Sequence, residues 1–320
     1  MSETMQGTVI RQYRGHYYVA VGDRLIDCAI SSRLRKELTY PEADPGSRRR
    51  RVQRVRRVQV VDPVAIGDRV EFEESDNNTG RINEVLPRRN KISRRASGTG
   101  RKEQILAANI DQVIPMVSTA EPDPDWSLLD RMLALGEWQG IPAVICLNKI
   151  DLTTEERARE AIALYEQIGY EIIYTSTVSN LGKASFQNLL QHRTSLLMGQ
   201  SGVGKSSLLN WLQPGLKLRT GEISAATGEG RHTTTHTELI ALEGGGLVGD
   251  IPGVKELRFW GIESHELPDL YIEFRPYLGQ CRFRDCTHIH EPGCALKEAV
   301  SAEEIPLARY ESYLRISQGR

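Results

Sequence analysis

Residues 199–206 have the types and spacing of a phosphate-binding loop. The stretch Gly-Gln-Ser-Gly-Val-Gly-Lys-Ser fits the pattern G-x-x-x-x-G-K-S, between an apolar strand-like run at 194–198 and a helical pattern at 206–212. Glycines let backbone N–H groups turn toward phosphate oxygens, Lys205 can reach the β- and γ-phosphates, and the Ser206 hydroxyl can ligate Mg²⁺. A glycine-rich turn without a ligand is the alternative. The predicted phosphate contacts are Gly199, Gln200, Ser201, Gly202, Val203, Gly204, Lys205, Ser206 and Ser207.

A second polar segment follows the apolar run at 143–147 and has the chemistry to read guanine. It is Asn148-Lys149-Ile150-Asp151, the pattern N-K-x-D. The Asp151 carboxylate can accept hydrogen bonds from guanine N1–H and from the N2 amine, a donor pair that adenine lacks. We expect Asn148 to tie this loop to the phosphate-binding loop, and Lys149 to pack along the base. The alternative is that Asp151 only precedes a helix.

Ser176 ends the next expected strand, within Thr-Ser-Thr at 175–177. A backbone N–H and a hydroxyl at this point could contact guanine O6, although a strand-end turn explains the same residues. Because ligands of open α/β sheets bind outside the carboxyl ends of the strands, we expect these loops to share one site. The predicted base contacts are Asn148, Lys149, Ile150, Asp151 and Ser176.

Two further segments carry groups suited to Mg²⁺ and the γ-phosphate. Asp250-Ile-Pro-Gly253 matches D-x-x-G, which brings Asp250 to Mg²⁺ through water and the Gly253 N–H to the γ-phosphate. Gly-Arg-His-Thr-Thr-Thr at 230–235 offers a threonine hydroxyl to the same ion. The predicted magnesium set is Ser206, Thr234 and Asp250, but the residues leave open whether Thr233 or Thr234 is the ligand. The alternatives are a strand-ending turn at 250–253 and an exposed loop at 230–235.

The order of these motifs indicates a circular permutation. Ordinary small GTPases run from P-loop through switch Thr and D-x-x-G to N-K-x-D, whereas here N-K-x-D comes first. The same sheet forms if the old termini are joined and the chain is opened after D-x-x-G. Val254 then stands where Ras-like enzymes carry a water-positioning Gln. His232 is the nearest polar residue in the sequence that could orient the attacking water, although it could also be only a spacer in the loop. Together with the phosphate-binding lysine and the candidate magnesium ligands, the predicted catalytic residues are Lys205, His232, Thr233 and Thr234.

A cysteine-rich segment near the end of the chain has the spacing of a metal site. Cys281, Cys286, His288 and Cys294 form C-x4-C-x-H-x5-C, with His290 as an alternative imidazole. Three thiolates and one imidazole make a closed tetrahedral set for a structural Zn²⁺, because four protein ligands leave no open position for catalysis. Free thiols beside a surface histidine are the alternative.

The elements needed to position these groups predict an α/β fold. Between 103 and 258 apolar strand-like runs alternate with helical patterns, which predicts a mostly parallel sheet with helices on both faces. Strands are expected at 112–117, 143–147, 172–174, 196–198, 239–242 and 247–249, although Pro115 interrupts the first. Helices are expected at 127–138, 154–168, 186–192 and 303–316.

The first 88 residues read as a small β barrel of the OB type. Alternating or β-rich runs at 8–13, 17–21 and 70–73 are separated by glycine- and asparagine-containing turns. Seven arginines and no acid occupy 48–57, a run that either contacts nucleic-acid phosphates or forms a solvated loop. Residues 89–102 are also basic and contain Ser and Gly, so they are expected to be a linker or a further nucleic-acid contact. The predicted domains are therefore 1–88, a linker 89–102, 103–258 and 259–320.

Composition supports an ordinary folded protein. Hydrophobic residues make up 39% of 320, the formal net charge is −1, and the five cysteines are an odd, uneven set that argues against a disulfide framework. No apolar run is long enough to span a bilayer, and the first residues carry no signal pattern, so we expect a cytoplasmic protein without membrane contact.

Taken together, the barrel, the permuted motifs with G-R-H-T-T-T and D-x-P-G, and the cysteine cluster resemble one family over nearly the whole chain. It is that of the ribosome-small-subunit-dependent GTPases, RsgA, also called YjeQ or YloQ. The resemblance implies a circularly permuted P-loop GTPase domain between an OB-fold barrel and a zinc-binding domain. It favours His288 over His290 as the zinc ligand, and it also implies that His232 is the residue that orients the attacking water.

The resemblance also implies an activity and partners. It implies hydrolysis of GTP to GDP with Mg²⁺, stimulated by the small ribosomal subunit, and a role in late maturation of that subunit through rRNA binding. One structural Zn²⁺ per chain, a monomeric state and contacts with other assembly factors belong to the same expectation. The motifs alone also allow a non-hydrolysing, GTP-dependent RNA-binding switch, which Val254 favours, and a nucleic-acid-dependent ATPase, which Asp151 disfavours.

Overall fold

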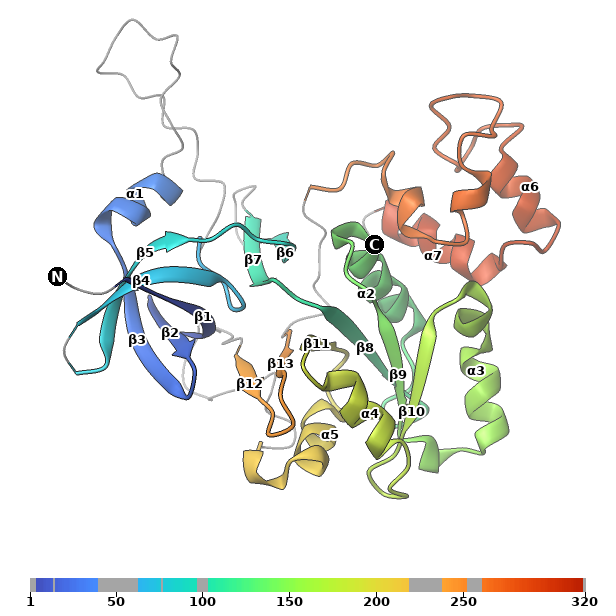
Figure 1. Ribbon diagram of the computed structural model, residues 1–320. Helices are drawn as coiled ribbons and strands as arrows, with labels where there is room; N and C mark the ends of the chain where they lie inside the picture. Colours follow the sequence, from blue (N-terminus) through green and yellow to red (C-terminus); the bar gives the residue numbers. More distant parts are fainter. Residues whose placement is uncertain are drawn as a thin grey trace, which may run out of the picture.

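The computed structural model describes residues 4–13, 15–39, 63–75, 77–96, 103–218, 238–251 and 261–318. In chain order they form a β barrel, a six-stranded sheet with helices on both faces, and a helical C-terminal part (Figure 1). The α/β fold class with a preceding barrel is as predicted. The arginine run at 48–57, the segment 219–237 and residues 252–260 lie outside the described residues.

The barrel is closed in the strand order β1-β2-β3-β5-β4. Its elements are β1 (Thr4–Tyr13), β2 (His16–Val21), β3 (Arg24–Ile30), α1 (Ser32–Thr39), β4 (Arg69–Ser75) and β5 (Thr79–Val85). The predicted runs lie within β1, β2 and β4, but β3 and β5 were not predicted. In β5 only Ile82 is buried, so the strand has too few apolar residues to show a period-two pattern.

A β hairpin joins the barrel to the central sheet, where the sequence predicted a linker. Strand β6 (Lys91–Arg95) pairs antiparallel with β7 (Glu103–Ala108). Ile92 is fully buried, and the ammonium group of Lys91 lies 2.5 Å from the Glu103 carboxylate. The strand was missed because most of its residues are basic or polar and only Ile92 is apolar. The linker prediction is therefore wrong for Lys91–Arg95.

The central sheet has the strand order β10-β9-β8-β11-β13-β12 and is parallel except for β12. Its strands are β8 (Gln112–Ser118), β9 (Val144–Asn148), β10 (Glu171–Thr175), β11 (Thr194–Met198), β12 (Leu239–Ala241) and β13 (Leu247–Asp250). All six predicted strands are present. Strand β8 continues through Pro115, which pairs with Met198 of β11, while the pairing with β9 includes Met116.

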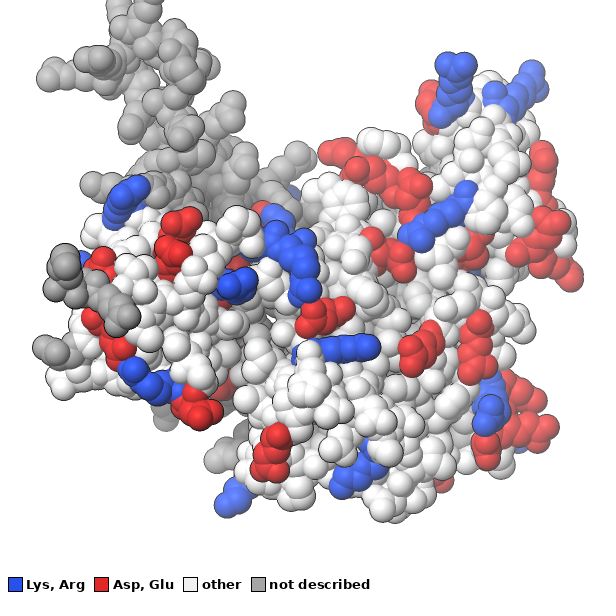
Figure 2. Space-filling model, viewed as in Figure 1, with Lys and Arg blue, Asp and Glu red and all other residues white. Residues whose placement is uncertain are grey.

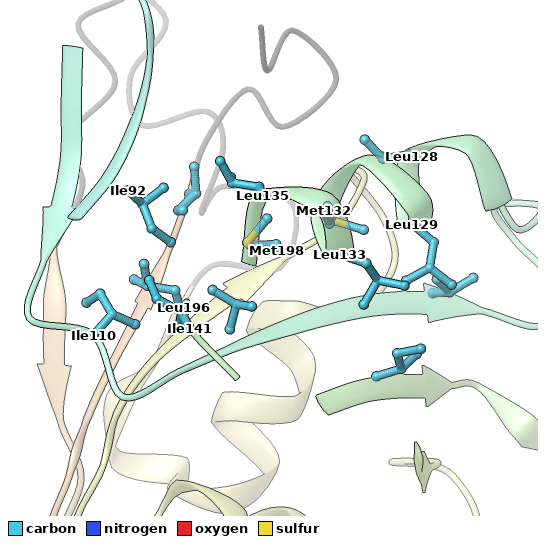
Figure 3. Close-up of a cluster of buried hydrophobic side chains, with 14 of the residues drawn as sticks. Ile92, Ile110, Leu128, Leu129, Met132, Leu133, Leu135, Ile141, Leu196 and Met198 are labelled. Atoms are coloured by element: carbon cyan, nitrogen blue, oxygen red, sulfur yellow. The ribbon is translucent and has the colours of Figure 1, made fainter. Parts of the chain in front are cut away.

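Helices cover both faces of this sheet, as predicted. They are α2 (Trp126–Gln139), α3 (Glu155–Ile168), α4 (Lys183–Leu190) and α5 (Lys205–Leu212), with short 3₁₀ turns η1 (Ile150–Leu152) and η2 (Pro214–Leu216). One face packs on α2 and α3, and the other packs on α4 and α5. Figure 3 shows α2 side chains, among them Leu129, Met132 and Leu133, together with Leu196 and Met198 of β11, and Ile92 of the hairpin joins the same cluster.

The C-terminal part consists of the 3₁₀ turns η4 (Leu267–Leu270) and η5 (Arg275–Tyr277) and the helices α6 (Ala295–Ser301) and α7 (Leu307–Ser317). The predicted helix 303–316 corresponds to α7, which begins later than expected. Its apolar cluster includes Ala134 of α2, with Trp138 packed against it. The core is therefore continuous with the central domain. Among the described residues, no helix combines the length and apolar character that crossing a bilayer requires.

A buried ionic network fixes α7 to the central domain. The side chain of Arg309 is 1% exposed and donates to Asp130 of α2 and, at 2.5 Å, to the Glu273 carboxylate. Asp130 also accepts from the Tyr165 hydroxyl of α3 at 2.9 Å. The guanidinium lies 4.6 Å from the centroid of the Tyr271 ring. One cation therefore neutralises two carboxylates whose side chains are 4% and 8% exposed.

Replacing Arg309 with methionine should lower the free energy of unfolding by roughly 3–5 kcal/mol, because the carboxylates of Asp130 and Glu273 would remain buried without their cation. Arg315→Met on the same helix is the matched control: its pair with Glu311 is exposed, so it should change stability by about 1 kcal/mol or less. Urea unfolding measures both. Equal stability of the two variants would contradict this account of the network.

Candidate nucleotide and metal sites

The segment 199–204 connects the carboxyl end of β11 to the first residue of α5, so the P-loop has its predicted strand–loop–helix setting. Gly204 has a φ of +106°, and a Cβ added there would lie 2.3 Å from Nδ2 of Asn148. A Cβ on Gly199 would lie 2.7 Å from the Met116 carbonyl oxygen. Only glycine fits these two positions without displacing a neighbour. Val203 is buried, while Gln200 donates to the Asp123 carbonyl at 2.8 Å.

Asn148 joins the N-K-x-D segment to this loop. Its Nδ2 donates to the Val203 carbonyl at 2.8 Å, and its Oδ1 accepts from the Thr175 hydroxyl at 2.9 Å. Because a carbonyl oxygen can only accept, the Val203 bond fixes which end of the amide faces the P-loop. The ends of β9, β10 and β11 thus meet in one buried group, and the link expected between the two motifs is present.

The rest of N-K-x-D is arranged as a loop with outward-facing polar groups. Lys149 has a φ of +59°, and its ammonium group donates to the Glu121 carbonyl. Asp151 is exposed, and its Oδ1 accepts from the Ser176 hydroxyl at 2.5 Å. Ser176 is itself buried and accepts from the backbone N–H of Ser179 at 3.0 Å. Ser176 therefore orients the Asp151 carboxylate.

Lys205 and Asp250 form the electrostatic centre of the site. Both are buried, and Nζ of Lys205 lies 3.8 Å from Oδ1 of Asp250. The same ammonium donates to the Gly199 carbonyl at 2.8 Å. Burial lowers the pKa of Lys205, which the nearby carboxylate partly opposes. Burial raises the pKa of Asp250 to about 6, against the effect of Lys205.

The carboxylate of Asp250 fits a cation. Neither of its oxygens has a hydrogen-bond partner among the described residues, although the side chain is 3% exposed. A buried carboxylate that accepts no hydrogen bond is costly even with an ammonium group 3.8 Å away, and oxygen ligands such as carboxylates suit a hard divalent cation such as Mg²⁺. Ser206 is also buried and begins α5 beside Lys205. These two residues could hold Mg²⁺ with a bound nucleotide.

Of the remaining residues that were predicted to contact the nucleotide, some lie in the part of the chain that the structure describes and others do not. Ser201 and Gly202 are exposed on the P-loop, Ser207 is half-buried on α5, and Ile150 packs against the central core. The predicted roles of His232, Thr233, Thr234, Gly253 and Val254 fall outside the described residues.

Three cysteines and one histidine form a compact cluster in the C-terminal part. The ligand atoms of Cys281, Cys286, His288 and Cys294 lie within 4.8 Å of one another. The sulfur atoms of Cys281 and Cys294 are 3.8 Å apart, and Nδ1 of His288 lies 3.5 and 3.3 Å from them. A tetrahedral centre with bonds of about 2.3 Å to sulfur and about 2.0 Å to nitrogen gives roughly these spacings. The cluster fits a metal ion with His288, and not His290, as its imidazole.

Hydrogen bonds hold the chain around this cluster. The Glu291 carboxylate accepts from the backbone N–H groups of Thr287, at 3.1 Å, and Ile289, at 3.2 Å. From α7, the hydroxyls of Tyr310 and Tyr313 donate to the carbonyls of His288 and Thr287 at 2.8 and 2.6 Å. The ligand loop is therefore shaped by the protein as well as by its ligand side chains.

Two contributions to these sites were missed in the sequence. The segment 175–177 was expected to contact guanine O6 or to form a strand-end turn, and a bond from Thr175 to Asn148 was not expected. Thr175 pairs with Asn148 in the register of β10 and β9, and that register is the signal that would have found it. Glu291 lies between two ligands and looks like a surface acid. No local pattern marks it.

The family model and the curated relatives that match this chain all belong to the same family. The model of the RsgA GTPase family matches residues 85–260. The chain is 37% identical over 313 residues to a protein of Alkaliphilus metalliredigens, covering 97% of this chain and 96% of the relative. It is 40% identical over 313 residues to one of Geobacillus kaustophilus, covering 97% and 95%. Both relatives are named small ribosomal subunit biogenesis GTPase RsgA.

Two solved structures resemble the whole fold. The crystal structure of YjeQ from Thermotoga maritima is 30% identical, has a TM-score of 0.75, and is matched over 99% of this chain and 98% of that chain. YloQ, described as a circularly permuted GTPase, is 27% identical with a TM-score of 0.66 over 99% and 95%. The permuted order of strands and motifs is thus shared with proteins of known structure.

Gly204→Ala should weaken nucleotide binding by about 10- to 100-fold, because strain at a positive φ costs roughly 1–3 kcal/mol and the new Cβ would also disrupt the Asn148–Val203 bond. Gly215→Ala is the matched control, since no atom of the described residues lies within 4 Å of its added Cβ. Calorimetry with GDP measures both. Unchanged affinity in the Gly204 variant would show that the loop does not hold phosphates in this conformation.

Proposed function

This chain belongs to the RsgA GTPase family, and from that premise we propose that it hydrolyses GTP as a late maturation factor of the small ribosomal subunit. One observation carries the proposal. The Asn148–Val203 hydrogen bond joins a guanine-reading motif to a phosphate-binding loop, so one site has groups for both ends of GTP. The names of the relatives, which cover nearly the whole chain, support the ribosomal role.

In this proposal the described residues bind and orient GTP. The Asp151 carboxylate, held by Ser176, accepts from guanine N1–H and N2. Backbone N–H groups of 199–204 surround the phosphates, and the Lys205 ammonium moves from the Gly199 carbonyl to the β- and γ-phosphate oxygens. Phosphate charge would keep Lys205 protonated despite its burial. A Mg²⁺ ion held by Ser206 and Asp250 would neutralise charge that develops on the phosphates.

The water-activating group belongs to the part of the chain that the structure does not describe. We propose that His232 orients the attacking water, because Val254 offers no polar atom where a glutamine is expected. Thr233 or Thr234 would complete the magnesium set, with Thr234 assigned, and the Gly253 N–H would contact the γ-phosphate.

Contacts with ribosomal RNA would involve both ends of the molecule. Lys and Arg side chains gather at the junction of the barrel with the central sheet (Figure 2), and the arginine run at 48–57 adds charge. On the C-terminal part, Phe283 is 41% exposed between Arg282 and Arg284, in the loop that joins two cluster cysteines. An exposed aromatic ring flanked by guanidinium groups suits stacking on an unpaired base.

The finer assignments complete the proposal. The metal of the cysteine cluster is one structural Zn²⁺ per chain, supported by three thiolates and an imidazole at tetrahedral spacing. The protein acts in the cytoplasm as a monomer and meets other assembly factors on the subunit, where it would hydrolyse GTP with water to GDP and phosphate.

Asp151→Asn should reduce GTP affinity by about 100-fold or more, since the amide offers a donor to guanine donors and a mispaired group costs roughly 2–3 kcal/mol. Xanthosine triphosphate, whose 2-oxo group accepts a hydrogen bond, should bind the variant better than the wild type, which controls for folding. Competition calorimetry gives both affinities. Wild-type GTP affinity in the variant would remove Asp151 from the site.

Protein purified without chelator should carry one zinc per chain. Cys294→Ser should lose it, and because Cys294 belongs to the C-terminal core, the melting temperature should fall as well. Cys28→Ala, which changes a buried cysteine of the barrel, should keep full zinc content. Elemental analysis reads out each sample, and the zinc assignment fails if the purified wild type contains none.

The function itself is tested by GTP turnover with purified small or large ribosomal subunits. We expect slow turnover alone, strong stimulation by small subunits only, and on the order of 100-fold loss of the stimulated rate in His232→Ala with GTP affinity unchanged. A wild type that binds GTP and small subunits without turnover would be the non-hydrolysing switch instead. Full stimulation of His232→Ala would make this histidine a spacer.

A further inference from the structure

The barrel touches the central domain through an irregularity in β1. The pairing of β1 with β2 shifts register between Val9 and Arg11, which leaves Ile10 as an extra residue. Val9 is fully buried in the barrel core, whereas Ile10 packs against the core cluster of the central sheet, to which Leu239 of β12 belongs. A β bulge thus turns one apolar side chain out of the barrel and into its neighbour.

The next residue binds β12 directly. Arg11 forms an isolated antiparallel bridge with Glu238, the residue before β12, and their side chains form an ion pair at 3.7 Å. The Arg11 guanidinium also lies 3.9 Å from the centroid of the Tyr18 ring on β2. Arg11 is therefore held on the barrel side while it binds β12.

This contact is two strands from the nucleotide site. Leu239 of β12 pairs with Gly249 of β13, and the next residue of β13 is Asp250, whose carboxylate faces Lys205. A displacement of β12 that carries β13 with it through their shared hydrogen-bond ladder would move Asp250 relative to the P-loop lysine.

A second anchor prevents the barrel from following such a shift freely. The Asn109 side chain donates to the Gly67 carbonyl at 2.9 Å, and the Ala108 N–H donates to the Ile66 carbonyl at 2.9 Å. Arg88 donates twice to the buried Asp68 carboxylate, at 2.7 and 2.6 Å. The Asn109 and Ala108 bonds fasten the barrel to the end of β7, and the Arg88 bonds tie the segment after β5 to the residue before β4. The contact at β12 therefore connects two parts that are already fixed at another point.

We propose that Ile10 and Arg11 of the barrel are positioning residues for the β12–β13 pair, and through it for Asp250. The barrel then biases the central domain between its GDP and GTP states. By linkage, RNA that shifts the barrel changes nucleotide preference, and nucleotide changes RNA affinity to the same extent. The expected effect of RNA rests on the proposed function, whereas the coupling between the barrel and the nucleotide site within the chain does not.

The direct test is a charge swap read out without ribosomes. The measured quantity is the ratio of affinities for GDP and a non-hydrolysable GTP analogue, in the presence of Mg²⁺, for Arg11→Glu, Glu238→Arg and the double variant. Each single variant should change the ratio by about twofold to fivefold, the range expected of a partly exposed ion pair, and the double variant should restore it. Restoration would show that the change depends on the pairing of these two side chains and not on either substitution alone.

Arg24→Glu is the matched control, because Arg24 pairs with Glu74 inside the barrel. It should leave the ratio at its wild-type value, and Ile10→Ala should change it as the charge variants do. Unchanged ratios in the single variants, or an equal change in the Arg24 control, would overturn the proposal.

The effect of RNA is tested separately from the coupling within the chain, by measuring GTP turnover of the same variants with small subunits. If the wild type is stimulated and the Arg11 and Glu238 variants keep both full stimulation and the wild-type ratio, the coupling is wrong while the proposed function stands. If the wild type is not stimulated, the proposed function fails, and the nucleotide ratios still decide whether the barrel is coupled to the site.

Discussion

The architecture of the nucleotide site depends on the side-chain amide of Asn148. One end of this amide donates to the P-loop and the other accepts from Thr175, so the ends of three parallel strands are fixed by one buried group. The chain reaches these strands in a permuted order, with the N-K-x-D loop before the P-loop. Three-dimensional proximity, and not chain order, makes the site, because parallel strands present their carboxyl ends at the same edge whatever the order of their connections.

Around that junction the fold leaves polar groups without the partners that burial demands. Asp250 is buried beside Lys205, its two oxygens accept no hydrogen bond from the described part of the chain, and burial shifts the pKa of both groups. A bound nucleotide and its cation would relieve both. In the network around Arg309, by contrast, one cation satisfies two buried carboxylates. The first arrangement is suited to a ligand, and the second to holding α7 against α2.

Much of this could be predicted from sequence, because the motifs are short and their chemistry is local. The six central strands, the P-loop, the Asn148 link and the three cysteines of the metal cluster follow from apolar runs and fixed spacings, whereas the choice of His288 over His290 came from the family resemblance. The β5 strand and the β6–β7 hairpin do not, since each buries few apolar residues among charged ones. Arg309, Asp130 and Glu273 are far apart in the chain, and the bulge at Ile10 depends on how β1 pairs. Such features arise only from tertiary packing.

The central claim is that the base-reading loop and the P-loop form one GTP site, and a crystal structure of the protein with GDP and Mg²⁺ tests it most directly. The account predicts guanine against the Asp151 carboxylate and the diphosphate over 199–204, with the Asn148–Val203 bond retained. A diphosphate bound there with its base away from Asp151, or a nucleotide bound elsewhere, would contradict it.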